Sequence, residues 1–265
     1  MLDAARAQLD RLGDPEWTTP ADRYSARVES FRGTARSDDG VVDMLVPHLS
    51  ADDRVLDVGA GAGRFSIPFA RQVKQVVALE PSPSMAQALT ADARSAGLSN
   101  ITLLGVPWED APDDLSVEVA FSAHVVYSLS RIEDFLLFLE RAARRWAAVV
   151  LFGGPAHSRL NPIWQKVHAE NRLLNPGLPQ LLSVLWSLDR YPDVAMLDVP
   201  PWPLGAPERA RRSLRRRMHI VPDSAADERL ESAMETLLAD WGDGQLGPTD
   251  RRAMKLAIVR WPVAR

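Results

Sequence analysis

Cysteine is absent from the 265 residues of this chain. Without a thiol the protein can form no disulfide and no thiolate metal site, and it has no cysteine nucleophile. Every reaction that proceeds through a covalent cysteine adduct is therefore excluded.

Long apolar runs and an excess of positive charge are also missing. No stretch of about 18 apolar residues, the length that a membrane helix needs, occurs in the chain. The first residues, MLDAARAQLDRL, carry charges throughout, so no secretory signal is expected. We therefore expect a soluble, cytoplasmic protein. The net charge of -4 argues against a nucleic acid as partner, although a local basic patch can exist in an acidic chain.

A glycine-rich stretch, RVLDVGAGAGRFSIPFARQVKQVVALEP, occupies residues 54–81. Its first part, Val55–Val58, is a short apolar run that ends in glycines, which is typical of a strand buried on both faces. Gly59, Gly61 and Gly63 then form a tight turn, at which residues without a Cβ let a ligand approach the backbone closely. A helix is expected next, with its free N–H groups directed at the turn.

A second buried strand, Val76–Leu79, ends on Glu80 and places a carboxylate at the same edge of the sheet as the turn. This is the layout of a nucleotide-type pocket. A dinucleotide fingerprint has the spacing G-x-G-x-x-G, whereas the third glycine comes one residue early here, at Gly63. An acid, Asp57, precedes the first glycine by two residues.

The spacing G-x-G-x-G with a preceding acid resembles motif I of the class I S-adenosylmethionine-dependent methyltransferases. The resemblance implies that S-adenosylmethionine is the cofactor and that Glu80 binds both ribose hydroxyls. A Rossmann-like domain that binds a nicotinamide cofactor, or no cofactor, is the alternative. The combination of GVPWED, HVVYSL and LNPIW, followed by a histidine, is similar to a bacterial group of these enzymes with mostly unassigned substrates.

Strands and helices alternate from residue 53 to residue 152, which predicts an α/β protein with a doubly wound sheet. The resemblance implies a mostly parallel seven-stranded sheet whose last strand runs antiparallel at or near the edge. The predicted strands are Val55–Val58, Val76–Leu79, Ile101–Leu104, Val117–Ser122, Trp146–Phe152, Val194–Val199 and Met254–Trp261. The predicted helices include Leu2–Leu12, Ala21–Phe31, Gly40–Leu49, one from Pro83 to about Ala96, Ile132–Arg144, Leu178–Leu188, Ala206–Met218 and Ala225–Trp241. Ser82 is the expected cap of the Pro83 helix, with Pro83 at its first position.

The predicted domain organisation has two parts. Residues 1–50 form an N-terminal helical lid, and residues 51–265 form the methyltransferase domain. Helical insertions are expected in that domain at about 155–190 and 206–242.

Cofactor contacts are expected from the glycine turn, from the residues after the second strand, and from the ends of the third and fourth strands. Many relatives keep an acid for the adenine amino group where this chain has Val106 and Pro107, so Trp108 and Glu109 are the predicted substitutes. Met85 is expected beside the adenine or in the core. The full predicted set is Asp57, Gly59, Ala60, Gly61, Gly63, Arg64, Glu80, Pro81, Met85, Trp108, Glu109 and Ser122.

The segment SAHVVYSL after the fourth strand resembles motif IV of the family. An N-P-P-Y type motif, used for planar amino groups of nucleobases, is absent. An acid placed to hold Mg²⁺ is absent as well, and no metal site is expected. His124 and Tyr127 are the candidate catalytic residues, with His124 acting as a general base or only positioning the loop.

Acceptor contacts are predicted from Trp17, Tyr24, Trp164 and His168, whose aromatic character favours a small apolar or planar acceptor. An arginine-rich run, residues 209–217, pairs with Glu228, Glu231 and Glu235 of the next helix or binds an anionic substrate or an RNA phosphate. The predicted reaction is methyl transfer to an oxygen or nitrogen of a small molecule by in-line displacement. A non-catalytic sensor or partner protein that binds the cofactor and an RNA methyltransferase are the alternatives. The protein is expected to be a monomer or a homodimer.

Overall fold

The computed structural model describes residues 2–12, 28, 40–154 and 158–263. The chain forms two compact units. Unit 1 comprises Met1–Pro20, Gly154–Pro176 and Pro200–Met254, and unit 2 comprises Ala21–Gly153, Gly177–Val199 and Lys255–Arg265. None of the described helices has the length and apolar character needed to cross a membrane.

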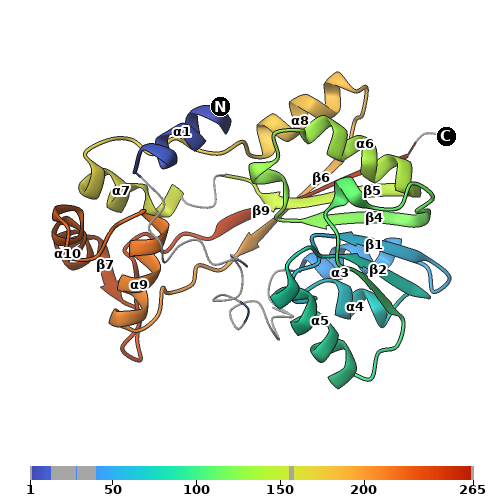
Figure 1. Cartoon of the computed structure of the whole chain (residues 1–265), viewed down its shortest axis with the longest axis horizontal. Coiled ribbons are helices and arrows are strands. Elements are labelled where there is room, and N and C mark those ends of the chain that lie inside the picture. The colour runs from blue at the N-terminus through green and yellow to red at the C-terminus, as the bar shows by residue number, and fades with distance from the viewer. Residues whose placement is uncertain (1, 13–27, 29–39, 155–157, 264–265) are drawn as a thin grey trace. The chain divides into compact units, whose positions relative to one another are not determined.

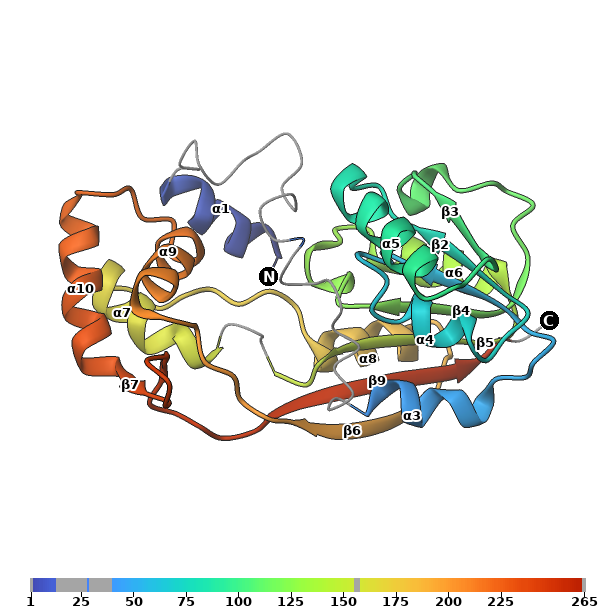
Figure 2. The ribbon, with the colours of Figure 1, turned by 90° about the horizontal axis from the view of Figure 1, so that it is seen from below.

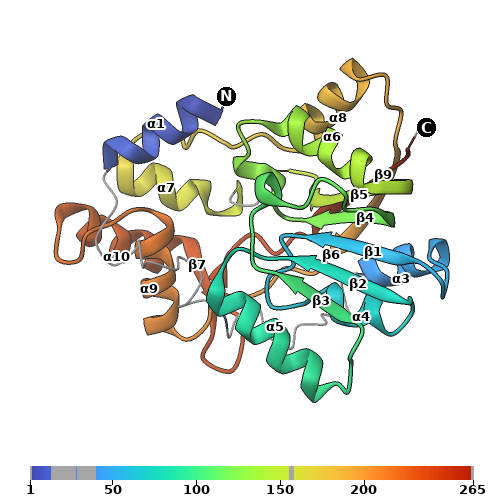
Figure 3. The same ribbon diagram turned by 45° about the vertical axis from the view of Figure 1, so that its right-hand side comes forward.

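Unit 2 is built on a seven-stranded sheet of order β3-β2-β1-β4-β5-β9-β6 (Figure 3). Neighbouring strands from β3 to β5 are parallel, and β9 runs antiparallel to β5, as predicted. The last strand lies between β5 and β6, one place from the edge. The strands are β1 (Arg54–Val58), β2 (Gln75–Leu79), β3 (Ile101–Leu104), β4 (Val117–Ala123), β5 (Ala143–Phe152), β6 (Asp193–Val199) and β9 (Met254–Pro262).

Helices cover both faces of this sheet, which is why its central strands read as continuous apolar runs. On β2, Val77 and Leu79 join the core cluster beneath α6, whereas Ala78 between them packs with Leu89 on the other face. Figure 1 shows α6 and α8 on one face and α4 and α5 on the other. The helices of unit 2 are α3 (Val41–Leu45), α4 (Ser66–Ala70), α5 (Pro83–Ser95), α6 (Ile132–Ala142) and α8 (Leu178–Ser187).

The start of α5 follows the local sequence as predicted. The Ser82 side chain caps the helix by accepting a hydrogen bond from the Met85 N–H at 3.3 Å, and Pro83 occupies the first turn. The cap satisfies one of the N–H groups that have no partner within the helix.

Unit 1 has its own apolar core, formed mainly by α7, α9 and α10. Figure 2 shows α10 with α7 and α9 beside it, and α7 and α10 pack along one another. The elements of unit 1 are α1 (Leu2–Leu12), η6 (Ser158–Leu160), α7 (Asn161–His168), α9 (Pro207–Arg217), α10 (Ala225–Leu237), β7 (Leu238–Asp240) and β8 (Leu246–Pro248).

Some sequence expectations differ from these elements, and others fall outside the described residues. The helix predicted to end at Trp241 stops at Leu237, because the next residues pair with β8 as the strand β7. The helices α7 and α8, expected in one insertion, belong to different units, since α8 contributes Leu181 and Leu185 to the core of unit 2. The expected lid falls largely on residues outside the described ranges, as does most of the predicted helix Ala21–Phe31.

Candidate active site

The register of the parallel strands brings three chain segments to one edge of the sheet. Val58, the last residue of β1, pairs with Leu79 of β2 and with Ser122 of β4. The three strands therefore end side by side. The segments that follow them lie at the same edge: the glycine turn after β1, Glu80 after β2 and His124 after β4. Ligands of doubly wound sheets bind beyond this carboxyl edge.

The three glycines of the turn have positive φ angles of 74°, 57° and 89° at Gly59, Gly61 and Gly63. A Cβ built on Gly59 would lie 2.4 Å from Val125, and one on Gly63 would lie 2.4 Å from Leu89. At Gly61 the same atom would meet nothing within 4 Å. Close packing accounts for the first and third glycines, and the second exposes its backbone to open space.

Glu80 is buried beside this open backbone, and only 6% of its surface is exposed. Its carboxylate accepts hydrogen bonds from the Gly61 N–H at 2.7 Å and from the Ser82 N–H at 2.8 Å. The two backbone donors fix the plane of the carboxylate.

Asp57 lies within β1 and is almost completely buried. The Ser66 hydroxyl, at the start of α4, donates a hydrogen bond of 2.5 Å to its carboxylate. Burial, opposed by the Ser66 hydrogen bond and assisted by the nearby Glu80 charge, raises the pKa of Asp57 from 3.8 to about 7. Asp57 thus ties the strand to the helix on the far side of the turn.

Several other predicted cofactor residues are part of the packing around the turn. The Ser122 hydroxyl donates to the Val58 carbonyl at 2.9 Å and joins β4 to β1. Met85 is buried with Ala62, so the structure places it in the core. Ala60 is buried, Arg64 lies over the Phe65 ring at 5.1 Å, and Pro81 is exposed.

Trp108 and Glu109 lie on η4 (Trp108–Asp110), after β3. The Trp108 ring packs edge-on against Phe135 at 5.5 Å and against Phe138 at 5.7 Å, both on α6. Its Nε1 atom is buried and has no hydrogen-bond partner within the described part of the chain. Glu109 is exposed. The indole N–H is therefore a donor that a bound group can satisfy.

His124 and Tyr127 interact directly at the end of β4. His124 Nδ1 lies 3.0 Å from the Tyr127 hydroxyl, and that hydroxyl accepts a hydrogen bond of 2.7 Å from the Phe152 N–H. His124 itself has a φ of 61°, a left-handed conformation uncommon outside glycine. Burial raises the pKa of Tyr127 above its ordinary value, so the phenol keeps its proton.

The predicted acceptor residues are not all described. Trp17 and Tyr24 lie outside the described residues. Trp164 and His168 belong to unit 1, where Trp164 is completely buried and the two ring centroids lie 4.4 Å apart. His168 Nε2 lies 2.8 Å from the Met218 carbonyl and donates to it. The two rings pack against each other at an angle of 47°.

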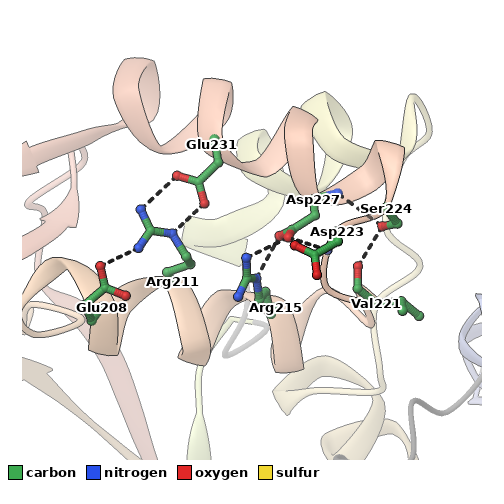
Figure 4. Close-up of polar contacts among 8 residues, drawn as sticks. All are labelled: Glu208, Arg211, Arg215, Val221, Asp223, Ser224, Asp227 and Glu231. Atoms are coloured by element: carbon green, nitrogen blue, oxygen red, sulfur yellow. Dashed lines mark hydrogen bonds and ion pairs between the residues drawn. The ribbon is translucent and has the colours of Figure 1, made fainter.

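The arginine-rich run forms α9, and its neighbour α10 supplies acids (Figure 4). Arg211 makes paired hydrogen bonds to Glu231 and a further one to Glu208. Arg215 binds both carboxylate oxygens of Asp227 at 2.7 and 2.6 Å. The predicted pairing with acids is therefore present at two arginines, with Asp227 as an unpredicted partner.

Two contributors to the site carry no separate signal in the sequence. Ser66 is nine positions from Asp57, and Val125 belongs to a loop after another strand, so only folding brings them to the turn. Within the described residues no group of three His, Cys, Asp or Glu side chains is arranged to hold a metal ion.

Comparison with known proteins agrees with this geometry. Residues 55–149 match the family described as methyltransferase domain. Together with the strand order, the match identifies a class I S-adenosylmethionine-dependent methyltransferase domain in this chain. The cofactor of this class is S-adenosylmethionine, and the reaction is S-adenosylmethionine-dependent methyl transfer.

Solved structures share the fold at low sequence identity. The YcgJ protein of Bacillus subtilis superposes with a TM-score of 0.58 at 14% identity, over 84% of this chain and 98% of that one. Magnesium protoporphyrin IX methyltransferase of Synechocystis, solved with bound S-adenosylhomocysteine, gives a TM-score of 0.55 at 12% identity, over 98% and 93%.

Curated relatives match mostly in part. A 23S rRNA (uracil(1939)-C(5))-methyltransferase of Pseudomonas aeruginosa is 44% identical over 59 residues, which are 22% of this chain and 13% of that protein. The matched part of a Haemophilus influenzae protein is likewise only 25% of its length. Ribosomal RNA small subunit methyltransferase A of Rhodococcus opacus is 25% identical over 96% of this chain and 90% of its own.

Proposed function

We propose that this chain transfers the methyl group of S-adenosylmethionine to an oxygen or nitrogen atom of a small-molecule acceptor. The observation that carries the cofactor assignment is the juxtaposition of Gly61 and Glu80. A Cβ on Gly61 would stand in open space, and the Gly61 N–H orients the Glu80 carboxylate. An open backbone next to a fixed carboxylate fits a nucleoside with vicinal hydroxyls.

In this proposal the side chains around the turn have distinct roles. Glu80 holds the ribose hydroxyls, and Trp108 and Glu109 lie near the adenine. Asp57 and Ser122 do not touch the cofactor but hold β1 against α4 and β4. When bound, S-adenosylmethionine supplies a sulfonium methyl group for in-line displacement, so the protein contributes mainly positioning and exclusion of water.

His124 and Tyr127 are the candidate catalytic residues of this proposal. The support is their contact at the end of β4, where His124 Nδ1 lies 3.0 Å from the Tyr127 hydroxyl. His124 acts as a general base toward the acceptor or only positions the loop, since an imidazole can take up a proton near neutral pH.

Turnover assays separate the two roles of His124. A general base requires that His124→Ala and His124→Gln lose the rate alike, because neither side chain can take up the proton of the acceptor. A positioning role predicts that His124→Gln keeps most of the rate that His124→Ala loses, because the amide of glutamine can still form hydrogen bonds. An unchanged rate in both variants would remove His124 from the reaction.

The pairing of the α9 arginines supports a small acceptor. Arg211 and Arg215 are each held by carboxylates of α10, so their charges are largely compensated within the helix pair. The absence of cysteine excludes methylation of a pyrimidine carbon through a cysteine adduct. The net charge of -4 adds no long-range attraction for a polyanion.

Transfer to RNA is the second candidate, because the match to the Rhodococcus small-subunit RNA methyltransferase extends over 96% of this chain. A single radiolabelled assay separates the candidates: the full-length protein is given labelled S-adenosylmethionine with phenols, carboxylic acids and amines, or with ribosomal RNA. Label in small molecules supports the proposal, and label in RNA alone overturns it in favour of the second candidate.

Calorimetry tests the cofactor separately from the acceptor. S-adenosylhomocysteine is expected to bind to the full-length protein, and NAD is not. Binding of NAD alone would overturn the cofactor assignment. Binding of S-adenosylhomocysteine without turnover on any acceptor would favour a non-catalytic sensor.

A further inference from the structure

Arg172, in the segment that follows α7, is a largely buried cation of unit 1. Its guanidinium carbon lies 4.7 Å from the centroid of the Trp164 ring. Burial lowers the pKa of Arg172 to about 10, and no carboxylate of the described residues acts against the shift. Its Nη1 atom is buried and has no hydrogen-bond partner among the described residues. Buried charges are otherwise paired, because leaving one uncompensated is costly.

Trp164, over whose ring the Arg172 guanidinium lies, provides a second donor without a partner among the described residues. Its side chain is completely buried, and its Nε1 atom has no partner within the described ranges. The indole nitrogen can only donate. The cation–π contact stabilises the guanidinium over the ring, but it satisfies neither N–H group.

The other neighbour of Trp164 does not alter this charge balance. The His168 ring packs against the Trp164 ring at a tilt of 47°, with centroids 4.4 Å apart, and its Nε2 donates to the Met218 carbonyl. Burial lowers the pKa of His168, so the imidazole is neutral at pH 7. A ligand that binds beside the Trp164 ring therefore has to compensate the positive charge of Arg172.

We propose that Arg172 and the indole N–H of Trp164 form a binding site for the oxyanion group, a carboxylate or a phosphate, of a small ligand. Such a group supplies both the negative charge and the acceptor atoms that the two donors lack. A water molecule would satisfy an N–H group but would leave the charge uncompensated. The burial of both donors favours a small molecule over the backbone of a nucleic acid, which is met by exposed basic side chains.

The site is independent of the acceptor chemistry proposed above, because all its residues belong to unit 1 and the cofactor residues belong to unit 2. If no anion binds to Arg172 and Trp164, the methyltransferase assignment is unaffected. Calorimetry with S-adenosylhomocysteine reports on the cofactor alone, so the two results are distinguishable.

Thermal unfolding of the full-length protein tests the proposal with inorganic phosphate and with benzoate, each against chloride at equal ionic strength. At least one anion is expected to raise the unfolding midpoint of the unaltered protein by about 2 °C or more. The Arg172→Met variant should lose this shift, and Arg212→Met, which removes an exposed arginine of α9, should keep it. A shift with phosphate alone assigns a phosphate ligand, and one with benzoate alone assigns a carboxylate.

The same variants distinguish a ligand site from mere packing. Without an anion, Arg172→Met should unfold at the same temperature as the unaltered protein or higher, because it removes an uncompensated buried charge. An equal drop of its midpoint in every buffer would show that Arg172 serves packing only and would overturn the proposal. So would the absence of any anion effect, or an equal effect in Arg172→Met.

The indole proton of Trp164 locates the bound anion. Its NMR resonance, assigned by comparison with Trp164→Phe, is expected to move during titration with the stabilising anion, while the other indole resonances stay in place. Stabilisation by the anion without movement of this resonance would place the binding elsewhere and contradict the proposal.

Discussion

Gly59 and Val125 pack so closely that a Cβ on the glycine would lie 2.4 Å from Cγ2 of the valine. A glycine is thus required at position 59 for two reasons. Val125, in the loop after β4, leaves no room for a Cβ, and the backbone has a φ of 74°. The two loops that border the candidate cofactor site are therefore fitted to each other before any ligand binds.

Gly59→Ala is expected to destabilise the protein by roughly 2 to 4 kcal/mol, from the left-handed backbone and from overpacking against Val125. Val125→Ala removes the clashing methyl group, so the double variant should recover the overpacking part of the loss. Urea unfolding of the single and double variants measures this coupling. Additive losses in the double variant would show that the contact does not restrict this position.

Gly61→Ala should behave differently, because its Cβ would enter open space. We expect a loss of only about 1 to 2 kcal/mol in stability, from the positive φ alone. Its affinity for S-adenosylhomocysteine should fall by at least about tenfold, since the Cβ occupies the proposed path of the ligand. Calorimetry and urea unfolding of the same preparation separate the effects, and unchanged affinity would place the ligand away from this glycine.

Glu80→Ala is expected to weaken S-adenosylhomocysteine binding by at least tenfold, because each charge-assisted hydrogen bond to a ribose hydroxyl contributes roughly 1.5 to 3 kcal/mol. Glu80→Gln tests the charge, as its amide keeps one acceptor oxygen for Gly61 or Ser82. Its affinity should lie between those of Glu80→Ala and the unaltered protein. Equal affinities of all three proteins in calorimetry would remove Glu80 from the site.

Asp57 should make stability fall as the pH rises from about 4 to 7. The pKa of its carboxyl is raised from 3.8 to about 7 in the folded protein, so the folded state binds the extra proton over this range. The stabilisation from the protonated Asp57 carboxyl is complete below pH 3.8 and is lost above about pH 7. Between these values the free energy of unfolding falls by at most about 1.4 kcal/mol per pH unit.

Urea unfolding at several pH values measures this effect. Asp57→Asn should remove the Asp57 part of the slope. Ser66→Ala deletes the hydrogen bond that stabilises the ionised form, so it should extend the loss of stability to higher pH. An unchanged slope in Asp57→Asn would show that another group titrates.

Asp227 should matter more to unit 1 than Glu231, although both pair with arginines of α9. The Asp227 side chain is only 6% exposed and also accepts from the Asp223 N–H at 2.9 Å, whereas that of Glu231 is 41% exposed. Asp227→Ala is expected to cost about 1 to 3 kcal/mol, and Glu231→Ala less than about 1 kcal/mol. Equal losses in urea unfolding would contradict this ranking.

Local patterns in the sequence predicted much of the fold. The strand Ile101–Leu104 and the Ser82 cap of α5 occur as expected, because apolar runs, caps and glycine turns act over a few residues. The glycine spacing and Glu80 indicated the cofactor class for the same reason. The end of α10 was not predictable locally, since Leu238–Asp240 become a strand only by pairing with Leu246–Pro248.

The amino-acid sequence by itself determined the central strands, the glycine turn and the carboxylate after β2, since each depends on neighbours along the chain. The tertiary structure alone decided how side chains far apart in the sequence meet. Folding joins Asp57 to Ser66, brings Tyr127 to the Phe152 N–H, and seats Arg172 over the buried Trp164. These contacts decide which side chains are buried and which donors lack a partner, because the solvent exposure and the partners of a residue depend on the packing of the whole chain.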